Sequence, residues 1–215
     1  MNENSSKQVL LSVIGVAVLL VAVVGVSFAF FTYSKAGTKN NTLTTGSIFF
    51  NFTEGNAINL TNEFPRSDTS GKALSADNNA ALTFHVLGYD GSSKGIAYTV
   101  LALPGDTISG KTRFKDSEIK FYLTGSSSNS SAITNKYSTP KAVGTNGSLT
   151  ASGITLATGK ITATSSTAQQ DDTYTLRMWI SDTVTIGATG ATYTETAFSK
   201  LYYSVKLKVV ANTAA

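Results

Sequence analysis

Histidine, the side chain most often used for acid–base catalysis and zinc binding, occurs once in the 215 residues, as His85. Because no H-E-x-x-H motif is present, a zinc site would consist almost wholly of carboxylates, which suit zinc poorly. A serine hydrolase triad would need the same histidine, and no G-x-S-x-G motif surrounds a serine. His85 alternates with apolar neighbours, which predicts the outer face of a strand. We therefore predict no catalytic residue, no metal and no cofactor.

Two further pairs of polar residues have spacings that could do chemistry. Ser117 and Lys120 match an S-x-x-K pair, but that chemistry needs both residues on one helix. Here the alternation of residues 118–124 predicts a strand, on which residues three apart face opposite ways. The adjacent Asp171 and Asp172 could join another oxygen ligand in a weak calcium site. A solvated turn is the more typical role for such a pair.

The longest apolar run, residues 9–31, carries no charge and is long enough to cross a membrane as a helix. Small residues at Ser27 and Ala29, followed by Phe30, form the pattern that signal peptidase recognises. We predict cleavage after Ala29, which makes residues 1–29 a signal peptide; the alternative is an uncleaved membrane anchor. Both interpretations predict that the rest of the chain is exported to the cell surface or beyond.

The remaining residues have the composition of an exported β protein. The formal net charge is only +4, and the lysines and arginines are scattered, so we predict no nucleic-acid partner. The chain contains no cysteine, so it must fold without disulfides. Ser, Thr, Gly and Asn are abundant, and the apolar residues are mostly β-branched or aromatic, which favours strands and turns.

Alternating apolar and polar residues predict strands at residues 47–53, 57–61, 81–87, 95–103, 118–124, 154–164, 174–180 and 201–209. We expect an all-β domain over residues 46–215, a two-sheet sandwich of the jelly-roll type, after a leader at residues 30–45. Trp179 is expected to face away from the core, under a loop. Residues 125–152 read as a polar, exposed insertion, where Asn129 and Asn146 are possible glycosylation sites.

Two segments near the amino terminus resemble a known family. The sequence SFAFFTY at residues 27–33 and TKNNTLTTGSI at residues 38–48 are similar to the export signal and mature start of the TasA/camelysin family of surface and biofilm-fibre proteins. Residues 57–62, 82–102 and 201–209 resemble later strands of that family more loosely. Some camelysin-like proteins are labelled metallopeptidases, a role that the single histidine of this chain does not favour.

The resemblance implies a jelly-roll subunit that polymerises by donor-strand exchange, in which an amino-terminal segment pairs with sheet edges of the next subunit. The implied donor residues are Phe30, Phe31, Thr32, Tyr33, Ser34 and Lys35. An alternative role for the aromatic residues is to end a membrane helix at the interface.

The sequence therefore predicts a non-enzymatic, exported subunit of a cell-surface or biofilm-matrix fibre. Its expected partners are further copies of itself, signal peptidase during export, and the membrane through residues 9–31 before or without cleavage. The alternative is a membrane-tethered β-sandwich that binds a ligand, such as a surface glycan, through its long loops.

Overall fold

The computed structural model describes residue 16 and residues 33–36, 41–45, 48–54, 58–61, 63–75, 81–92, 94–129, 133–187 and 189–213. The chain divides into two compact units, residues 1–33 and 34–215. Only Val16 and Tyr33 of the first unit are described, so the predicted signal peptide or anchor lies almost wholly outside the described residues. Within the described part of the chain, no helix is long and apolar enough to span a membrane.

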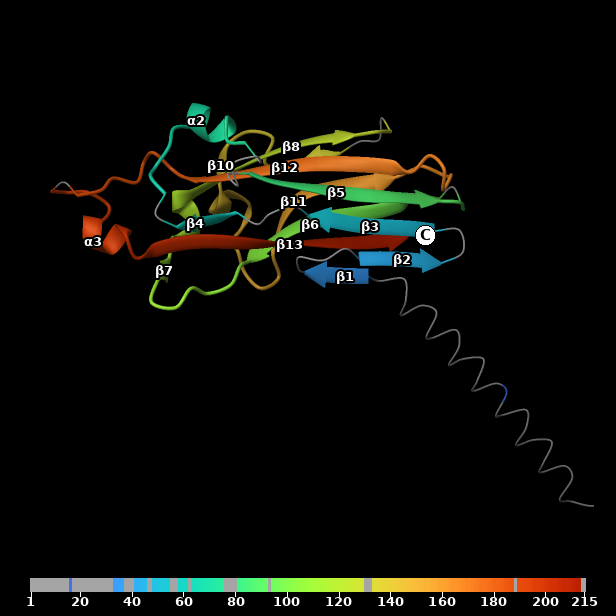
Figure 1. Cartoon of the computed structure of the whole chain (residues 1–215), viewed down its shortest axis with the longest axis horizontal. Coiled ribbons are helices and arrows are strands. Elements are labelled where there is room, and N and C mark those ends of the chain that lie inside the picture. The colour runs from blue at the N-terminus through green and yellow to red at the C-terminus, as the bar shows by residue number, and fades with distance from the viewer. Residues whose placement is uncertain are drawn as a thin grey trace, which may run out of the picture. The chain divides into compact units, whose positions relative to one another are not determined.

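The second unit consists mainly of two β-sheets (Figure 1). The first, called the β13 sheet, has the strand order β1 (Tyr33–Ala36), β13 (Leu201–Thr213), β6 (Ile96–Pro104), β11 (Ile154–Ile161) and β9 (Thr134–Asn135); β4 (Asn59–Thr61) and β7 (Thr112–Arg113) also pair with β13. The second, called the β12 sheet, has the order β10 (Lys141–Ala142), β8 (Ile119–Ser127), β12 (Gln170–Ile180), β5 (Ala81–Asp90), β3 (Ile48–Glu54) and β2 (Asn41–Thr45). The strand pairs whose register is defined are antiparallel, except for β7 and β13, which pair in parallel.

Alternation of buried and exposed side chains along the strands places the core between the two sheets. In β12, Tyr174, Leu176, Met178 and Ile180 are almost fully buried, as their spacing predicts. The inward residues of β5 and β8 meet them in the same cluster: Leu82, Phe84, Val86, Ile119, Phe121 and Leu123. The prediction of an all-β, two-sheet sandwich is confirmed.

Successive long strands alternate between the two sheets. The chain passes from β5 to β6, β8, β11, β12 and β13, and each of these steps changes sheet. Each long strand consequently pairs with strands distant in sequence, as when β12 pairs with both β5 and β8. Such pairing explains why the alternation of each strand is readable from the sequence while the order of the strands is not.

Short strands lie in the predicted leader, which includes the candidate donor segment, and in the predicted insertion. The leader contains β1 and β2, ahead of the predicted domain boundary at residue 46. Residues 125–152 contain the end of β8, then β9, β10 and a 3-10 helix, η3 (Val143–Asn146). Tyr137, Val143 and Leu149 of this insertion are buried, and the Tyr137 hydroxyl donates to Val143 O at 3.0 Å. The insertion is thus anchored to the core, and the prediction of an exposed excursion is corrected.

Trp179 lies on the outer face of the β12 sheet beneath residues 63–75, which include the short helix α2 (Asp68–Lys72). Only 1% of Trp179 is exposed, yet it does not belong to the core cluster between the sheets, which confirms the expected loop cover. Lys120 Nζ binds Asp68 Oδ1 at 2.7 Å, and Arg66 N donates to Ile180 O at 2.9 Å. These contacts hold the cover on the sheet.

Replacing Gly71 with alanine is expected to destabilise the fold by about 1 to 3 kcal/mol, the usual cost of overpacking. A Cβ atom at Gly71 would lie 2.2 Å from Trp179 Cε2, so the helix or the indole must move. At an exposed position in a helix, Gly→Ala normally stabilises the protein. A loss of stability at Gly71 would therefore indicate its close packing against Trp179. The measurement is urea unfolding, with Thr69→Ala in the same helix as the control. A Gly71→Ala variant as stable as the control would contradict the packing described here.

Candidate functional site

The amino-terminal strand β1 contains Tyr33, Ser34 and Lys35 of the six residues predicted as the donor. Phe30, Phe31 and Thr32 lie outside the described residues, as do Ser27 and Ala29 of the predicted cleavage site. Residues 34–36 belong to the same compact unit as β13, and β1 is the neighbour of β13 in the sheet order. In this chain, therefore, part of the predicted donor segment pairs with the last strand of its own fold.

The side of β13 that meets β1 is only partly occupied. Phe114 N donates to Tyr202 O, and Gly105 N donates to Ser204 O, so β7 and β6 share one side of β13. Strand β6 then pairs continuously from Val205 to Thr213. On the opposite side, β4 pairs with three residues of β13 and β1 has only four residues. Much of this edge of the thirteen-residue strand β13 therefore faces no strand among the described residues, and such an edge can pair with another segment.

A second exposed feature lies at the end of the sandwich where β13 begins, beside the short helix α3 (Glu195–Phe198). Phe64 is 69% exposed, and its ring stacks on that of Phe198 with 6.4 Å between centroids. An open hollow of about 580 Å³ lies between Phe64, Ile186, Glu195, Phe198 and Ser199. A smaller hollow of about 60 Å³ lies on the β4 side of Phe64, next to Trp179. This end presents an aromatic surface with one carboxylate, that of Glu195, at its edge.

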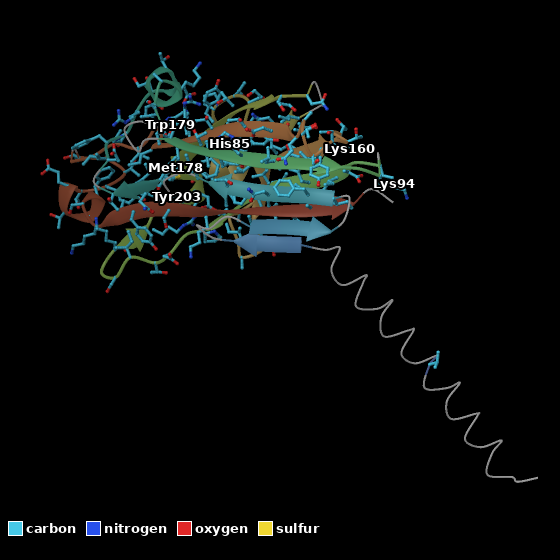
Figure 2. All side chains as sticks on the ribbon, turned by 45° about the vertical axis from the view of Figure 1, so that its right-hand side comes forward. His85, Lys94, Lys160, Met178, Trp179 and Tyr203 are labelled. Carbon is cyan, nitrogen blue, oxygen red and sulfur yellow. The ribbon has the colours of Figure 1, made fainter. Side chains whose placement is uncertain are left out.

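His85 lies on the outer face of the β12 sheet, as predicted (Figure 2). Its Nδ1 is 3.1 Å from Asp171 Oδ1 and 3.1 Å from Thr173 Oγ1, both on the neighbouring strand β12. The side chains of His85 and Asp171 are 42% and 39% exposed. Within the described residues, no group of three or more His, Cys, Asp or Glu side chains could hold a metal ion. The three side chains form an ordinary cross-strand polar contact, which the sequence alone did not reveal.

The prediction of a solvated turn at Asp171 and Asp172 is wrong, because both residues lie within β12. Alternation along the strand sends Asp171 outward and Asp172 into the core, where it is fully buried. Asp172 accepts hydrogen bonds from the Tyr98 hydroxyl, the Ser127 hydroxyl and the Gln170 side-chain amide. Ser117 and Lys120 do not share a helix, because Ser117 belongs to the 3-10 helix η2 (Asp116–Glu118) and Lys120 lies in β8.

Three tyrosines are held protonated inside the fold. The hydroxyls of Tyr98 and Tyr174 lie 2.7 Å apart beside Asp172, and the Tyr203 hydroxyl donates to Asp116 Oδ1 at 2.7 Å. Burial raises the pKa of all three phenols far above the ordinary value, and the neighbouring carboxylates raise it further. Nearer the hollow, burial and the Glu118 carboxylate raise the pKa of Tyr193 to about 12. The hydroxyls of Tyr98, Tyr193 and Tyr203 thus each join one part of the fold to a carboxylate of another.

Asp90 organises the turn between β5 and β6. Its carboxylate accepts from Ser92 N at 2.9 Å, from Ser92 Oγ at 2.6 Å and from Gly95 N at 2.6 Å. Burial alone would raise the pKa of Asp90, but these donors outweigh burial and hold it below its ordinary value. The folded state therefore favours the ionised form of this carboxyl.

A group whose pKa is lowered by folding adds stability above its unfolded pKa and loses it as the pH falls through its folded pKa. We expect Asp90→Asn to lower the free energy of unfolding at neutral pH. The difference between this variant and the parent chain should shrink below about pH 4, where the carboxyl becomes protonated in the unfolded chain. Urea unfolding at a series of pH values is the measurement, with exposed Asp106→Asn as the control. A difference that is constant from pH 3 to pH 7 would contradict this account.

The two possible glycosylation sites lie in different settings. Asn129 is exposed just after β8, and its side-chain amide donates to Thr162 Oγ1 at 2.9 Å. Asn146 ends the 3-10 helix η3, and its side chain is outside the described residues. The structure does not bring these two residues into one site with His85 or with β1.

No family model, no curated protein and no solved structure matches this chain. The described residues thus define a class by architecture, an all-β two-sheet sandwich with an amino-terminal strand on its last strand. Its two unusual surfaces are the partly filled edge of β13 and the aromatic hollow beside α3.

Proposed function

We propose that this protein is a non-enzymatic, exported subunit of a cell-surface or biofilm-matrix fibre that assembles by amino-terminal donor-strand exchange. In this proposal the hydrophobic helix of residues 9–31 directs export, and signal peptidase cleaves after Ala29. The freed segment that starts at Phe30 then pairs with a sheet edge of the next copy. The likeness of residues 27–48 to the TasA/camelysin family supports this reading.

The observation that carries the proposal is the position of β1 beside β13. A short amino-terminal strand at a partly filled edge can be exchanged for the same strand of another copy, because the ladder lost within a chain is regained between chains. We also propose that the sandwich is a jelly roll. Successive long strands that alternate between two sheets are typical of that fold, and the six long strands from β5 to β13 alternate in this way.

The energetics of the donor segment are balanced. Burial of Phe30, Phe31 and Tyr33 contributes roughly 1.5 to 3 kcal/mol for each ring. Ordering an extended segment costs about 1 to 2 kcal/mol for each residue. Because these amounts are close, assembly depends on the ladder hydrogen bonds and on freeing the segment by cleavage.

The test is negative-stain electron microscopy of the chain beginning at Phe30 beside one beginning at Lys39. We expect filaments from the first chain only, since the second lacks β1. Circular dichroism must show that the shorter chain is folded. Filaments from both chains would contradict donor-strand exchange, and folded monomers from both would favour the membrane-tethered alternative.

Proline substitutions in β1 provide a matched control. Backbone N–H groups alternate in direction along a strand, so either Ser34→Pro or Lys35→Pro removes a donor that faces β13. We expect one of the two to abolish filaments, whereas Ser34→Ala and Lys35→Ala, which keep the N–H groups, still assemble.

A further inference from the structure

The aromatic end of the sandwich has two hollows that share one exposed ring. Phe64 is 69% exposed, and it lines both the hollow of about 580 Å³ beside α3 and the hollow of about 60 Å³ beside β4. Its ring stacks on Phe198, which packs edge-on against Phe114 with 5.7 Å between centroids. Phe64 therefore rests on rings of the fold while most of its own surface is open to solvent. The larger hollow has the volume of an ordinary ligand pocket.

The smaller hollow combines apolar walls with a buried donor. Five aliphatic residues line it: Ile58, Leu60, Leu74, Met178 and Ile180. Trp179 lines it as well, and the buried Nε1 of this indole has no hydrogen-bond partner within the described part of the chain. A water molecule occupies about 30 Å³ of the liquid, so this hollow has room for a group of only a few heavy atoms. A group that fits is small, partly apolar and able to accept a hydrogen bond.

The polar side chains around the two hollows are almost balanced in charge. Beside the smaller hollow, Arg66 and Glu63 form an ion pair with 3.0 Å between Nη2 and Oε2, and Asn59 lies with them in the lining. The larger hollow is lined by Glu195 and Ser199, and by no lysine or arginine of the described residues. These groups offer donors and acceptors to the hydroxyls of a ligand. They offer an anionic ligand no free positive charge.

A neutral sugar that carries an acetamido group has the matching chemistry. The C–H groups on the face of a sugar ring have a partial positive charge, which is attracted to the negative face of an aromatic ring such as that of Phe64. The hydroxyls of a sugar both donate and accept hydrogen bonds. The acetamido group adds a methyl group for the apolar walls of the smaller hollow and a carbonyl oxygen for the indole N–H of Trp179.

We propose that Phe64 and its two hollows bind a neutral oligosaccharide that contains N-acetylhexosamine. One sugar ring packs on the open surface of Phe64, and its acetamido group enters the smaller hollow, where the carbonyl oxygen accepts from Trp179 Nε1. The next sugar lies in the larger hollow, where its hydroxyls bind Glu195 and Ser199. No residue of β1 lines either hollow, so this site goes beyond the proposed function and does not depend on the assembly of fibres.

Isothermal titration calorimetry of the chain beginning at Phe30 tests this site. The probe is chitotetraose, a linear tetramer of N-acetylglucosamine. The matched control is cellotetraose, which has the same linkage and a hydroxyl in place of each acetamido group. We expect chitotetraose to bind with a dissociation constant of about 1 mM or tighter, and at least about tenfold more tightly than cellotetraose. The emission of Trp179, the one tryptophan of the chain, should follow the same curve. Binding of neither sugar, or equal affinity for both, would overturn the proposal.

Three variants locate the binding. Phe64→Ala removes the exposed ring and should weaken chitotetraose binding at least about tenfold, while its exposure leaves the fold little affected. Tyr89→Ala, on the outer face of β5 and in the lining of neither hollow, is the matched control and should bind like the parent. Trp179→Phe keeps a ring beneath the cover but removes the N–H, and should reduce the preference for chitotetraose to less than about threefold.

The results that contradict this site are separate from those that contradict the fibre. Undiminished binding of chitotetraose by the Phe64→Ala chain would overturn the site. Binding of an acetylated Gly/Ser peptide in place of the sugar would overturn it as well, because the hollows would then recognise a polypeptide. Filaments do not enter the calorimetric readout, so a chain that forms none can still bind chitotetraose.

Discussion

Replacing Asp172 with alanine is expected to lower the free energy of unfolding by about 3 kcal/mol. The carboxylate is fully buried and accepts from Tyr98, from Ser127 and, at 2.9 Å, from Gln170 Nε2. Without this carboxylate, the hydroxyls of Tyr98 and Tyr174 keep only the hydrogen bond to each other. One of their two hydroxyl protons is then left without an acceptor. One amide proton of Gln170 is also left unpaired. Each unpaired buried donor costs roughly 1 to 3 kcal/mol.

The neighbouring residue supplies the control for this prediction. Asp171 lies one position earlier on the same strand, is 39% exposed and contacts His85. Exposed pairs of this kind contribute little, so Asp171→Ala should change stability by less than about 1 kcal/mol. Urea unfolding followed by the fluorescence of Trp179 measures both variants. Equal losses for Asp171→Ala and Asp172→Ala would contradict the assignment of Asp172 to the core.

The free energy of unfolding is expected to fall steeply above pH 10. Tyr98, Tyr174 and Tyr203 have a pKa that burial raises far above the ordinary value. A group whose pKa is raised by folding contributes stability that is fully present below the unfolded pKa, near 10, and is lost as the pH rises toward the folded pKa. Over this range each tyrosine lowers stability by about 1.4 kcal/mol per pH unit. Together the three residues should unfold the protein in moderately strong base.

The slope of stability against pH tests this explanation directly. Tyr203→Phe removes one of the three phenols, together with its hydrogen bond to Asp116. The variant should be less stable at neutral pH, and its slope above pH 10 should be shallower by about 1.4 kcal/mol per pH unit. Tyrosinate absorbance should rise together with unfolding. Ionisation of all the tyrosines in a still-folded chain would contradict the burial of these hydroxyls.

The strands could be predicted because their evidence is local. The alternation in residues 47–53, 81–87, 95–103, 118–124, 174–180 and 201–209 predicts β3, β5, β6, β8, β12 and β13, together with their inward faces. The sandwich follows, since each strand has one apolar face that must be buried. Strand order depends on contacts between distant residues, and no local pattern encodes it.

The polar features of the structure were predicted less well. Asp172 lies one residue after Asp171, and only the register of β12 against β5 and β8 decides which of the two enters the core. The hollow beside α3 combines Phe64 with Phe198, residues that are far apart in the sequence. A Gly/Thr-rich connection gave no sign of α3, because a four-residue helix is too short for a periodic pattern. Phe64 was the available signal, as an isolated aromatic residue in a polar segment.

The pairing of β1 with β13 joins the first strand of the described fold to the last. A ribosome makes the chain from the amino terminus, so β1 waits without its partner until nearly every other strand has been synthesised. Contacts between such distant segments form late and slowly, because closing the long intervening loop costs entropy first. During that interval the amino-terminal strand is free to meet another chain. The pairing of β1 with β13 is therefore among the last contacts of the fold that a newly made chain can complete.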